Sequence, residues 1–289
     1  GKSGTTSLFD ILKQHPQVYG PKKKELRFFS YDKHYAKGPQ FYEDSYFKKA
    51  GGYAIRTEAS PAYLNWSEKS APRIKEVYGD RPIKLLAIFR DPVKRAYSQY
   101  WHRWRLGSED GSYTFAEAVK FEEERIKANF ETLYYKGDGL HGYVRCSHFM
   151  QRLQPFLDRF PRESFHFMLQ QDLYVDFDAR MAELCRFLGI DDTFKFSSLA
   201  SNEAFVPRYS FLGRNDRDLK NKLGKHFFRM FLSKNAKTMF VRDLIMKKFE
   251  FPPMDEDVRK ALYAEFAEET TQLAKLIGRD LSDWTYKPL

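Results

Sequence analysis

The chain has 289 residues, and its 49 Lys and Arg against 39 Asp and Glu leave a formal net charge of +10 at pH 7. This length is enough to bury one large core, so we expect a single domain. No apolar stretch is long enough to cross a bilayer, which excludes a transmembrane helix within this chain. The positive charge favours a negatively charged partner: nucleotide phosphates, an acidic protein, an acidic glycan, nucleic acid or an anionic membrane.

Gly, Ser and Thr dominate the start of the chain, GKSGTTSL at Gly1–Leu8, and lead into a helix predicted over residues 3–14. Such a loop lets backbone N–H groups approach an anion, and the positive end of the helix dipole adds attraction. Lys2 adds a point charge. The loop alone is also compatible with an ordinary capped turn or with the end of a nucleoside-triphosphate loop. The strand that usually precedes such a loop is missing, so we expect this chain to be a piece of a longer polypeptide.

The rest of the chain alternates between strand-like and helix-like patterns. Ile83–Phe89 is a continuous apolar run, typical of a parallel strand covered on both faces. Asp91 and Pro92 then begin a helix that runs to about Trp104. Further strands are expected at Tyr53–Arg56 and Ser164–Leu169, and further helices at Phe115–Phe130, between the glycine-rich break Gly137–Gly142 and Phe160, at Phe177–Gly189 and at Asp255–Ile277. The alternation predicts an α/β fold: a P-loop-like central parallel sheet flanked by helices on both faces, in a single domain over residues 1–289.

The region 217–248 departs from this alternation. It holds ten Lys or Arg against Asp218 and Asp243 as its only acids, with phenylalanines between them. We interpret it as a basic helical insert or cover. It is either a solvated helix face over the core, a docking surface for an acidic partner or a mobile cover over the site.

Two cysteines, Cys146 and Cys185, each lie in a helix-like pattern and form neither a disulfide framework nor a metal-ligand spacing. We predict two buried thiols, with a bridge between them as the alternative, and a reducing compartment. No cluster of His, Asp, Glu and Cys has the spacing of metal ligands, so no metal is expected.

The segment FRDPVKRAYSQY, residues 89–100, follows the central strand at its carboxyl end, where open α/β sheets bind ligands. Arg90 leaves the strand and Ser98 lies on the next helix, so a guanidinium and a hydroxyl could converge on one phosphate. A surface ion pair is the alternative role of Arg90. A nucleotide kinase would use a strand-terminal Asp for Mg²⁺, but Pro92 after Asp91 favours a helix cap.

Several motifs resemble, in order and spacing, the sulfotransferases that use 3′-phosphoadenosine 5′-phosphosulfate (PAPS), of the heparan-sulfate type and their bacterial relatives. These motifs are GKSGTTSL, KELRFF at 24–29, EASPAY at 58–63 and FRDPVKRAYSQY. QQDLYVD, FLGI at 187–190 and the closing GRDLSDW extend the resemblance over nearly the whole chain.

The resemblance implies a PAPS site at the start of the chain. Lys2 would contact the bridging oxygen of the phosphosulfate, and Arg90 with Ser98 would hold the 3′-phosphate. Glu25 matches the general base of the glycan enzymes, which takes the proton of the attacking group. The residues expected to bind the 5′-phosphate are Ser3, Gly4, Thr5, Thr6 and Ser7.

Other candidate residues are less closely tied to the family pattern. Glu58 competes with Glu25 and is a candidate for substrate binding, while Ala59 replaces a lysine of the family. His141 and His148 are alternative bases on the acceptor side. Arg208, in the segment 201–214, is a candidate for a second contact to the 3′-phosphate.

For the acceptor, the resemblance favours a β-hydroxyacyl group on an acidic acyl carrier protein, because some bacterial relatives are sulfotransferase domains embedded in polyketide synthases. The basic region 217–248, the truncated start, the missing disulfides and the replacement of the family lysine by Ala59 fit this interpretation. A glycan or a small alcohol is the alternative. Two functions from other classes stay open. One is a P-loop nucleotide kinase that uses ATP and Mg²⁺, and the other is a noncatalytic polyanion-binding module. We expect no nucleic-acid partner, and a bacterial cytoplasmic location with the Golgi lumen as the alternative.

Overall fold

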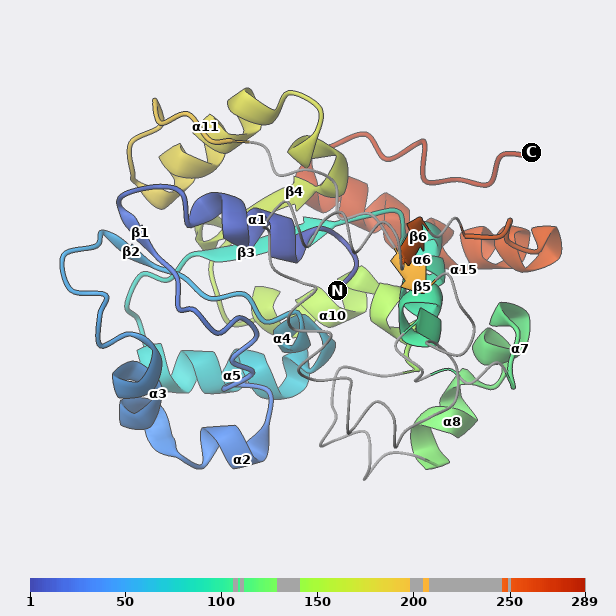
Figure 1. The fold of residues 1–289 in the computed structure, drawn as a ribbon, viewed down its shortest axis with the longest axis horizontal. Coiled ribbons are helices and arrows are strands. Elements are labelled where there is room, and N and C mark those ends of the chain that lie inside the picture. Colours follow the sequence, from blue (N-terminus) through green and yellow to red (C-terminus); the bar gives the residue numbers. More distant parts are fainter. Residues whose placement is uncertain are drawn as a thin grey trace.

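The computed structural model describes residues 1–105, 109, 112–128, 141–197, 205–207, 246–248 and 251–288 (Figure 1). The helices are α1 (Thr5–Leu12), α2 (Asp32–Tyr35), α3 (Gly38–Tyr46), α4 (Ala62–Asn65), α5 (Ser67–Tyr78), α6 (Pro92–Arg105), α7 (Phe115–Lys120), α8 (Glu122–Ala128), α10 (Phe149–Leu157), α11 (Phe177–Leu188) and α15 (Glu256–Ile277). The strands are β1 (Val18–Tyr19), β2 (Ile55–Arg56), β3 (Leu85–Phe89), β4 (Phe165–Leu169), β5 (Phe205–Pro207) and β6 (Met246–Lys248), and 3₁₀ turns occur at Arg145–Ser147, Arg162–Ser164 and Gln170–Leu173.

The strands pair in parallel at the centre of the molecule. β3 and β4 run side by side, with Leu85 opposite Phe165 and Phe89 opposite Leu169. β1 and β2 form a second parallel pair, and β5 and β6 an antiparallel one. The predicted strands at Ile83–Phe89 and Ser164–Leu169 are therefore confirmed, and they are parallel. The prediction of one central sheet was too simple: among the described residues, the strands form separate pairs. β1 and β2 are short, and Pro16 and Pro21 on either side of β1 limit its hydrogen bonding.

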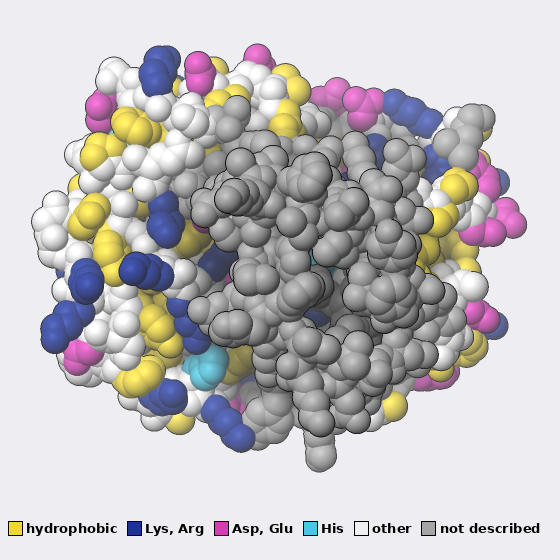
Figure 2. Space-filling model, in the orientation of Figure 1, with side chains coloured by type: hydrophobic (Ala, Val, Ile, Leu, Met, Phe, Trp, Pro, Cys, Tyr) yellow, Lys and Arg dark blue, Asp and Glu magenta, His cyan; other side chains and the backbone are white. Residues whose placement is uncertain are grey.

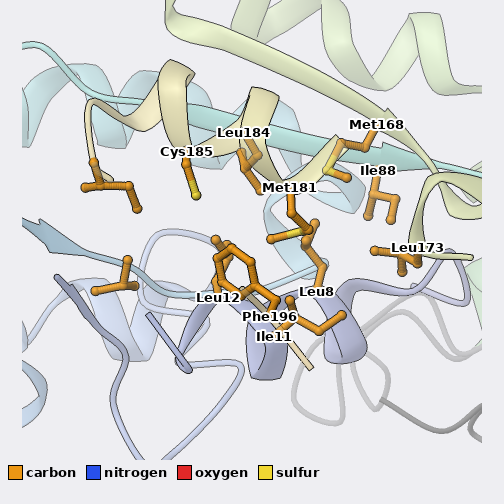
Figure 3. Packing of buried hydrophobic residues seen from close by; sticks show 12 residues of the cluster. Leu8, Ile11, Leu12, Ile88, Met168, Leu173, Met181, Leu184, Cys185 and Phe196 are labelled. Atoms are coloured by element: carbon orange, nitrogen blue, oxygen red, sulfur yellow. The ribbon is translucent and has the colours of Figure 1, made fainter. Parts of the chain in front are cut away.

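Alternate residues of β3 and β4 point to opposite faces, as the pleat of a strand requires. Ile88 and Met168 pack with α1 and α11 in one buried cluster (Figure 3). Phe89 and Leu169 pack with residues of α10 and α15 in another. In Figure 1, α1 and α11 lie on one side of the pair, and α4, α5 and α10 on the other. The prediction of helices on both faces is confirmed, and it explains why the central strand is apolar throughout.

The helix end predicted at Gly189 is confirmed, and the structure adds a cap at Asp255. Gly189 ends α11 in the left-handed region at φ 72°, and the Asp255 side chain caps α15 by accepting a hydrogen bond from Val258 N. The helix predicted over residues 115–130 is two helices in its described part, because the chain turns at Phe121 between α7 and α8.

Helices α2 to α5 were not predicted from the sequence. α2 and α4 have four residues each, too few for a periodic pattern, and Pro72 interrupts that of α5. Most of the region predicted as a basic helical insert, residues 217–245, lies outside the described residues. Its last part was predicted wrongly, since Met246–Lys248 pairs with β5 as a strand.

Both cysteines are buried free thiols, as predicted. No helix in the described part of the chain is long and apolar enough to cross a membrane.

Arg95 fastens α6 to the segment before α10. Its side chain is 1% exposed, and Nε donates to Ser147 Oγ at 2.7 Å. Nη1 donates to Gln99 Oε1 at 2.6 Å and Nη2 to the carbonyl of Tyr143. The buried charge thus has partners on three sides, which offset part of its desolvation.

Replacing Arg95 by alanine should destabilise the fold. We expect Arg95→Ala to lower the free energy of unfolding by about 3 kcal/mol, because the buried partners of the guanidinium lose their hydrogen bonds. Urea denaturation followed by circular dichroism measures this change. The neighbouring Lys94→Ala is the control: its side chain is 63% exposed, so its effect should stay within about 0.5 kcal/mol. Equal effects of the two substitutions would contradict the role given to Arg95.

Candidate active site

The loop before α1 lies against the carboxyl ends of β3 and β4. Gly4 begins α1 in the left-handed region at φ 94°, and its carbonyl accepts from Leu8 N at 3.0 Å. A Cβ on Gly4 would stand 2.8 Å from Leu173 Cδ1, in the turn after β4. The left-handed backbone therefore favours glycine at this position, and a side chain here would also have to displace the end of the Leu173 side chain. Among the described residues no side chain caps the start of α1, so its backbone N–H groups are suited to hold an anion.

Arg90 joins this loop to the end of β3. Its Nη1 donates to the carbonyl of Lys2 at 3.2 Å. Burial lowers the pKa of Arg90, but a guanidinium stays charged at neutral pH, so its charge lies beside the loop. Ser98 is buried on α6, the helix that follows. The structure thus brings Arg90 to Lys2 and places Ser98 on the same strand–turn–helix unit.

Asp91 is a helix cap, as the sequence indicated. Its Oδ1 accepts from Val93 N at 2.9 Å and from Lys94 N at 3.0 Å. Its Oδ2 accepts from the hydroxyl of Tyr263 at 2.7 Å. Both carboxylate oxygens therefore serve the start of α6 and its contact with α15, an arrangement that does not suit a Mg²⁺ ligand.

Glu25 lies in a strained loop beside α1. Glu25 and Arg27 both have positive φ, 59° and 57°, around the buried Leu26. Arg27 Nη2 donates to Glu25 Oε2 at 2.8 Å, and Lys24 Nζ is 3.4 Å from Glu25 Oε1. The same ammonium donates to Thr6 Oγ1 at 2.8 Å, which ties the Glu25 carboxylate to the first turn of α1.

The cations beside Glu25 determine its ionisation. Burial acts to raise the pKa of the Glu25 carboxyl, but the hydrogen bond from Arg27 and the charges of Lys24 and Arg27 outweigh it. The pKa of Glu25 therefore lies below its ordinary value, and the side chain is an ionised carboxylate at neutral pH.

A cavity of about 480 Å³, here called the Glu25 cavity, opens in front of this carboxylate. It is lined by Thr6, Lys23, Lys24, Glu25, Arg27, Tyr31, Lys33 and His34. Figure 2 shows Lys and Arg side chains gathered over the part of the surface that carries α2, α3 and the β1–β2 pair. The lining residues Arg27, Tyr31, Lys33 and His34 were not predicted as site residues from the sequence. The cationic run before Glu25 was the signal that could have indicated them.

Glu58 lies apart from the Glu25 cavity. Its Oε2 accepts from Ser60 Oγ at 2.9 Å, while Oε1 is buried and has no hydrogen-bond partner in the described part of the chain. Burial raises the pKa of Glu58 to about 7. Glu58 was predicted to bind substrate. Its Oε1 atom is buried, and the residue lines a second cavity, of about 1040 Å³, which Gly1, Ser3 and Thr5 also line.

The two candidate histidines lie in different surroundings, and neither lines the Glu25 cavity. His148 sits between two carboxylates of α15, with Nε2 at 3.2 Å from Glu265 and Nδ1 at 3.3 Å from Glu269. These hydrogen bonds raise the pKa of His148 to about 9, so it carries its proton at neutral pH and cannot accept another.

His141 belongs to a buried cluster around Glu109. Its Nδ1 is 3.0 Å from Glu109 Oε1, and the same carboxylate accepts from Arg125 and from the hydroxyl of Tyr143. Glu109 thus fixes the imidazole of His141, which is 7% exposed, inside this cluster. Arg208 lies outside the described residues. Within those residues, no group of three or more His, Cys, Asp or Glu could hold a metal ion.

Comparison with known proteins points to one family. Residues 1–250 match the family model described as Sulfotransferase domain. Heparan sulfate glucosamine 3-O-sulfotransferase 5 of Mus musculus is 35% identical over 167 residues, which cover 57% of this chain and 44% of that protein. Membrane-associated sulfotransferase kil1 of Dictyostelium discoideum is 36% identical over 132 residues, covering 44% of this chain and 27% of that protein. The matched region is thus less than half the length of either relative.

A solved structure extends the similarity to the whole fold. The crystal structure of a sulfotransferase from Alicyclobacillus acidocaldarius superposes with a TM-score of 0.68 at 26% sequence identity, covering 98% of this chain and 95% of that one. A family model matched over most of the chain and a sulfotransferase of similar fold lead to the same conclusion: the chain belongs to the sulfotransferase domain family.

Proposed function

We propose that this protein transfers a sulfuryl group from PAPS to a hydroxyl of an acceptor. The observation that carries the proposal is the hydrogen bond from Arg90 to the carbonyl of Lys2. It brings a guanidinium to the loop whose N–H groups suit a 5′-phosphate, so one ligand with phosphates at both its 5′ and 3′ positions fits the pair. Ser98 would add a hydroxyl to the 3′-phosphate, and Arg208 a second cation.

The reaction would proceed in line between two oxygens. The acceptor oxygen forms a bond to sulfur while the bond from sulfur to the bridging phosphate oxygen breaks, and adenosine 3′,5′-bisphosphate leaves. Glu25, ionised at neutral pH, would take the acceptor proton. Lys2 would stabilise the charge that develops on the leaving phosphate. Positioning and charge stabilisation then supply most of the catalysis, as in phosphoryl transfer.

The residues after β3 favour this reaction over nucleotide kinase chemistry. A P-loop kinase holds Mg²⁺ with a carboxylate at a strand end. Asp91 is the carboxylate in that place, and its oxygens accept from Val93 N, Lys94 N and Tyr263.

The lining of the Glu25 cavity supports an acceptor that carries negative charge. Among the described residues that line the cavity, Glu25 is the one acidic residue, and the four lysines and arginines are Lys23, Lys24, Arg27 and Lys33. An acidic glycan comes first, because relatives of this chain are named for heparan sulfate. A β-hydroxyacyl group on an acidic carrier protein, favoured by the sequence, is the second candidate. The positive charge of residues 217–248 supports it.

Nucleotide binding tests whether the protein uses PAPS as its sulfuryl donor. Adenosine 3′,5′-bisphosphate at about 100 times its dissociation constant should stabilise the protein by about 2.7 kcal/mol, and ATP with Mg²⁺ should stabilise it far less. Differential scanning fluorimetry measures both responses. Arg90→Ala should lose most of the response, because the 3′-phosphate loses its guanidinium. A response only to ATP with Mg²⁺ would replace the proposal with a kinase.

Lys2 should act on turnover rather than on binding alone. We expect Lys2→Ala to lower kcat by about 10²–10³-fold at saturating PAPS, because the leaving phosphate loses a cation in the transition state. Lys13→Ala, which removes an exposed lysine from the other end of α1, is the matched control and should keep its kcat. An unchanged kcat in Lys2→Ala would refute the catalytic role of this residue.

Transfer from labelled PAPS to a panel of acceptors tests the acceptor class. The panel contains acidic glycans, neutral glycans, small alcohols and hydroxyacyl groups bound to a carrier protein. We expect acidic glycans to be the best acceptors. We also expect Lys33→Ala to raise their KM by about tenfold while kcat stays the same, because one charge-assisted contact is lost. Preference for a neutral acceptor would contradict the proposal that the acceptor is negatively charged. Preference for the carrier-bound hydroxyacyl group would favour that acceptor over an acidic glycan.

A further inference from the structure

A chain of hydrogen bonds links the Glu58 carboxylate to the loop that carries Glu25. Ser60 Oγ donates to Glu58 Oε2 at 2.9 Å. The same Ser60 oxygen accepts from the backbone N–H of Arg27 at 3.0 Å. Arg27 then donates from Nη2 to Glu25 Oε2 at 2.8 Å. Each link is of ordinary hydrogen-bond length, so the two glutamates are connected through one hydroxyl and one arginine.

The loop at the end of this chain needs such support. Glu25 and Arg27 are both held at positive φ, a conformation that costs a residue with a side chain free energy unless the surroundings impose it. Leu26 between them is 1% exposed, and its carbonyl lies 3.1 Å from His34 Nδ1. Ser60 binds Arg27 N from a segment 33 residues further along the chain. It therefore ties the strained loop to a separate part of the fold.

The protonation state of Glu58 controls how Ser60 is oriented. An ionised carboxylate can only accept, so it takes the single proton of the Ser60 hydroxyl and leaves the hydroxyl lone pairs for Arg27 N. A protonated Glu58 can donate to Ser60 instead, and the hydroxyl is then free to rotate. The hydrogen bond that holds the backbone at Arg27 is thus strongest when Glu58 is ionised.

We infer that Glu58 is a positioning residue: through Ser60 it holds the backbone at Arg27 and, with it, the Glu25 carboxylate in front of the cavity. The inference rests on the proposed function, in which Glu25 accepts the proton. It gives Glu58 a role in support of the base, in addition to the predicted role in substrate binding.

The surroundings of Glu58 make this support depend on pH. Burial is the main cause that raises the pKa of Glu58 to about 7, and the charge of Glu25 acts in the same direction. The other titratable groups that face Glu58 are Tyr42 of α3, Tyr63 of α4 and Tyr78 of α5, whose own pKa values are raised and which stay neutral here. Glu58 therefore gains its charge near neutral pH, where Glu25 is already ionised.

Activity and stability should respond to this titration in opposite directions. Turnover should rise with pH through about pH 7, because the ionised Glu58 holds the loop. The folded state binds the Glu58 proton more tightly than the unfolded chain, whose glutamate pKa is about 4.3. Stability from this group is therefore present at low pH and is lost as pH rises from about 4.3 towards 7.

The experiment compares kcat at saturating PAPS between pH 5.5 and 8.5 in the wild type, Glu58→Gln and Ser60→Ala. The wild type should rise about tenfold per unit below the pKa of Glu58 and level off above it. Both variants should stay low and flat across this window, because glutamine cannot ionise and alanine breaks the link. Binding of adenosine 3′,5′-bisphosphate should be unchanged in both. Glu76→Gln, an exposed glutamate on α5, is the control and should follow the wild type.

The double variant separates positioning from a general loss of structure. If Glu58 acts through Ser60, the variant carrying both substitutions should be no slower than either single variant, whereas independent effects would multiply. A wild-type pH profile in Glu58→Gln, or multiplied losses in the double variant, would overturn the inference. Glu25→Gln tests the proposed function separately. If it remained active, Glu25 would not be the base and the positioning role would fall with it. If Glu25→Gln were inactive but Glu58→Gln behaved as the wild type, Glu25 would remain the proposed base. Only the positioning role of Glu58 would then be refuted.

Discussion

Burial of both faces of the parallel pair β3–β4 is the constraint on which the rest of the structure depends. Side chains alternate across the pair, so α1 and α11 must cover one face and α5, α10 and α15 the other. Parallel strands end at the same edge, and the two helical layers leave that edge open. The loop at Gly1–Gly4, the turn at Gln170–Leu173 and Arg90 all meet there. The position proposed for the phosphates is thus a consequence of how the core is covered.

The ionisation of Glu25 and Glu58 is determined by their local environments rather than by residue type. Glu25 and Glu58 are both partly or fully buried carboxyls, and burial alone would raise the pKa of each. Lys24 and Arg27 reverse the direction at Glu25, whereas at Glu58 the uncharged hydrogen-bond partners do not outweigh burial. Two carboxyls with different ionisation lie at opposite ends of one hydrogen-bonded chain, which allows one to react and the other to regulate its position.

Local environment also distinguishes the charged side chains that hold the fold together from those that are candidates for catalysis. His148 is fixed by two carboxylates of α15, and Asp91 is engaged by the start of α6 and by Tyr263. Arg95 is enclosed by neutral acceptors. These groups hold α6, α10 and α15 together behind the site. Lys2 and Glu25 lie in loops at the open edge, where a ligand can reach the groups that would act on it.

The features that depend only on neighbouring residues in the chain could be predicted from the sequence. The capping residues Asp91 and Gly189, the apolar run of β3 and the glycine-rich start all act within a few residues, so the sequence alone was sufficient to predict them. The role of Glu58 and the lining of the Glu25 cavity depend on helices α2 to α5, which are too short or too interrupted for a periodic signal. Only the tertiary structure decided which carboxylate faces the cavity and which is buried, because burial and the pKa it sets arise from residues brought together from distant parts of the chain.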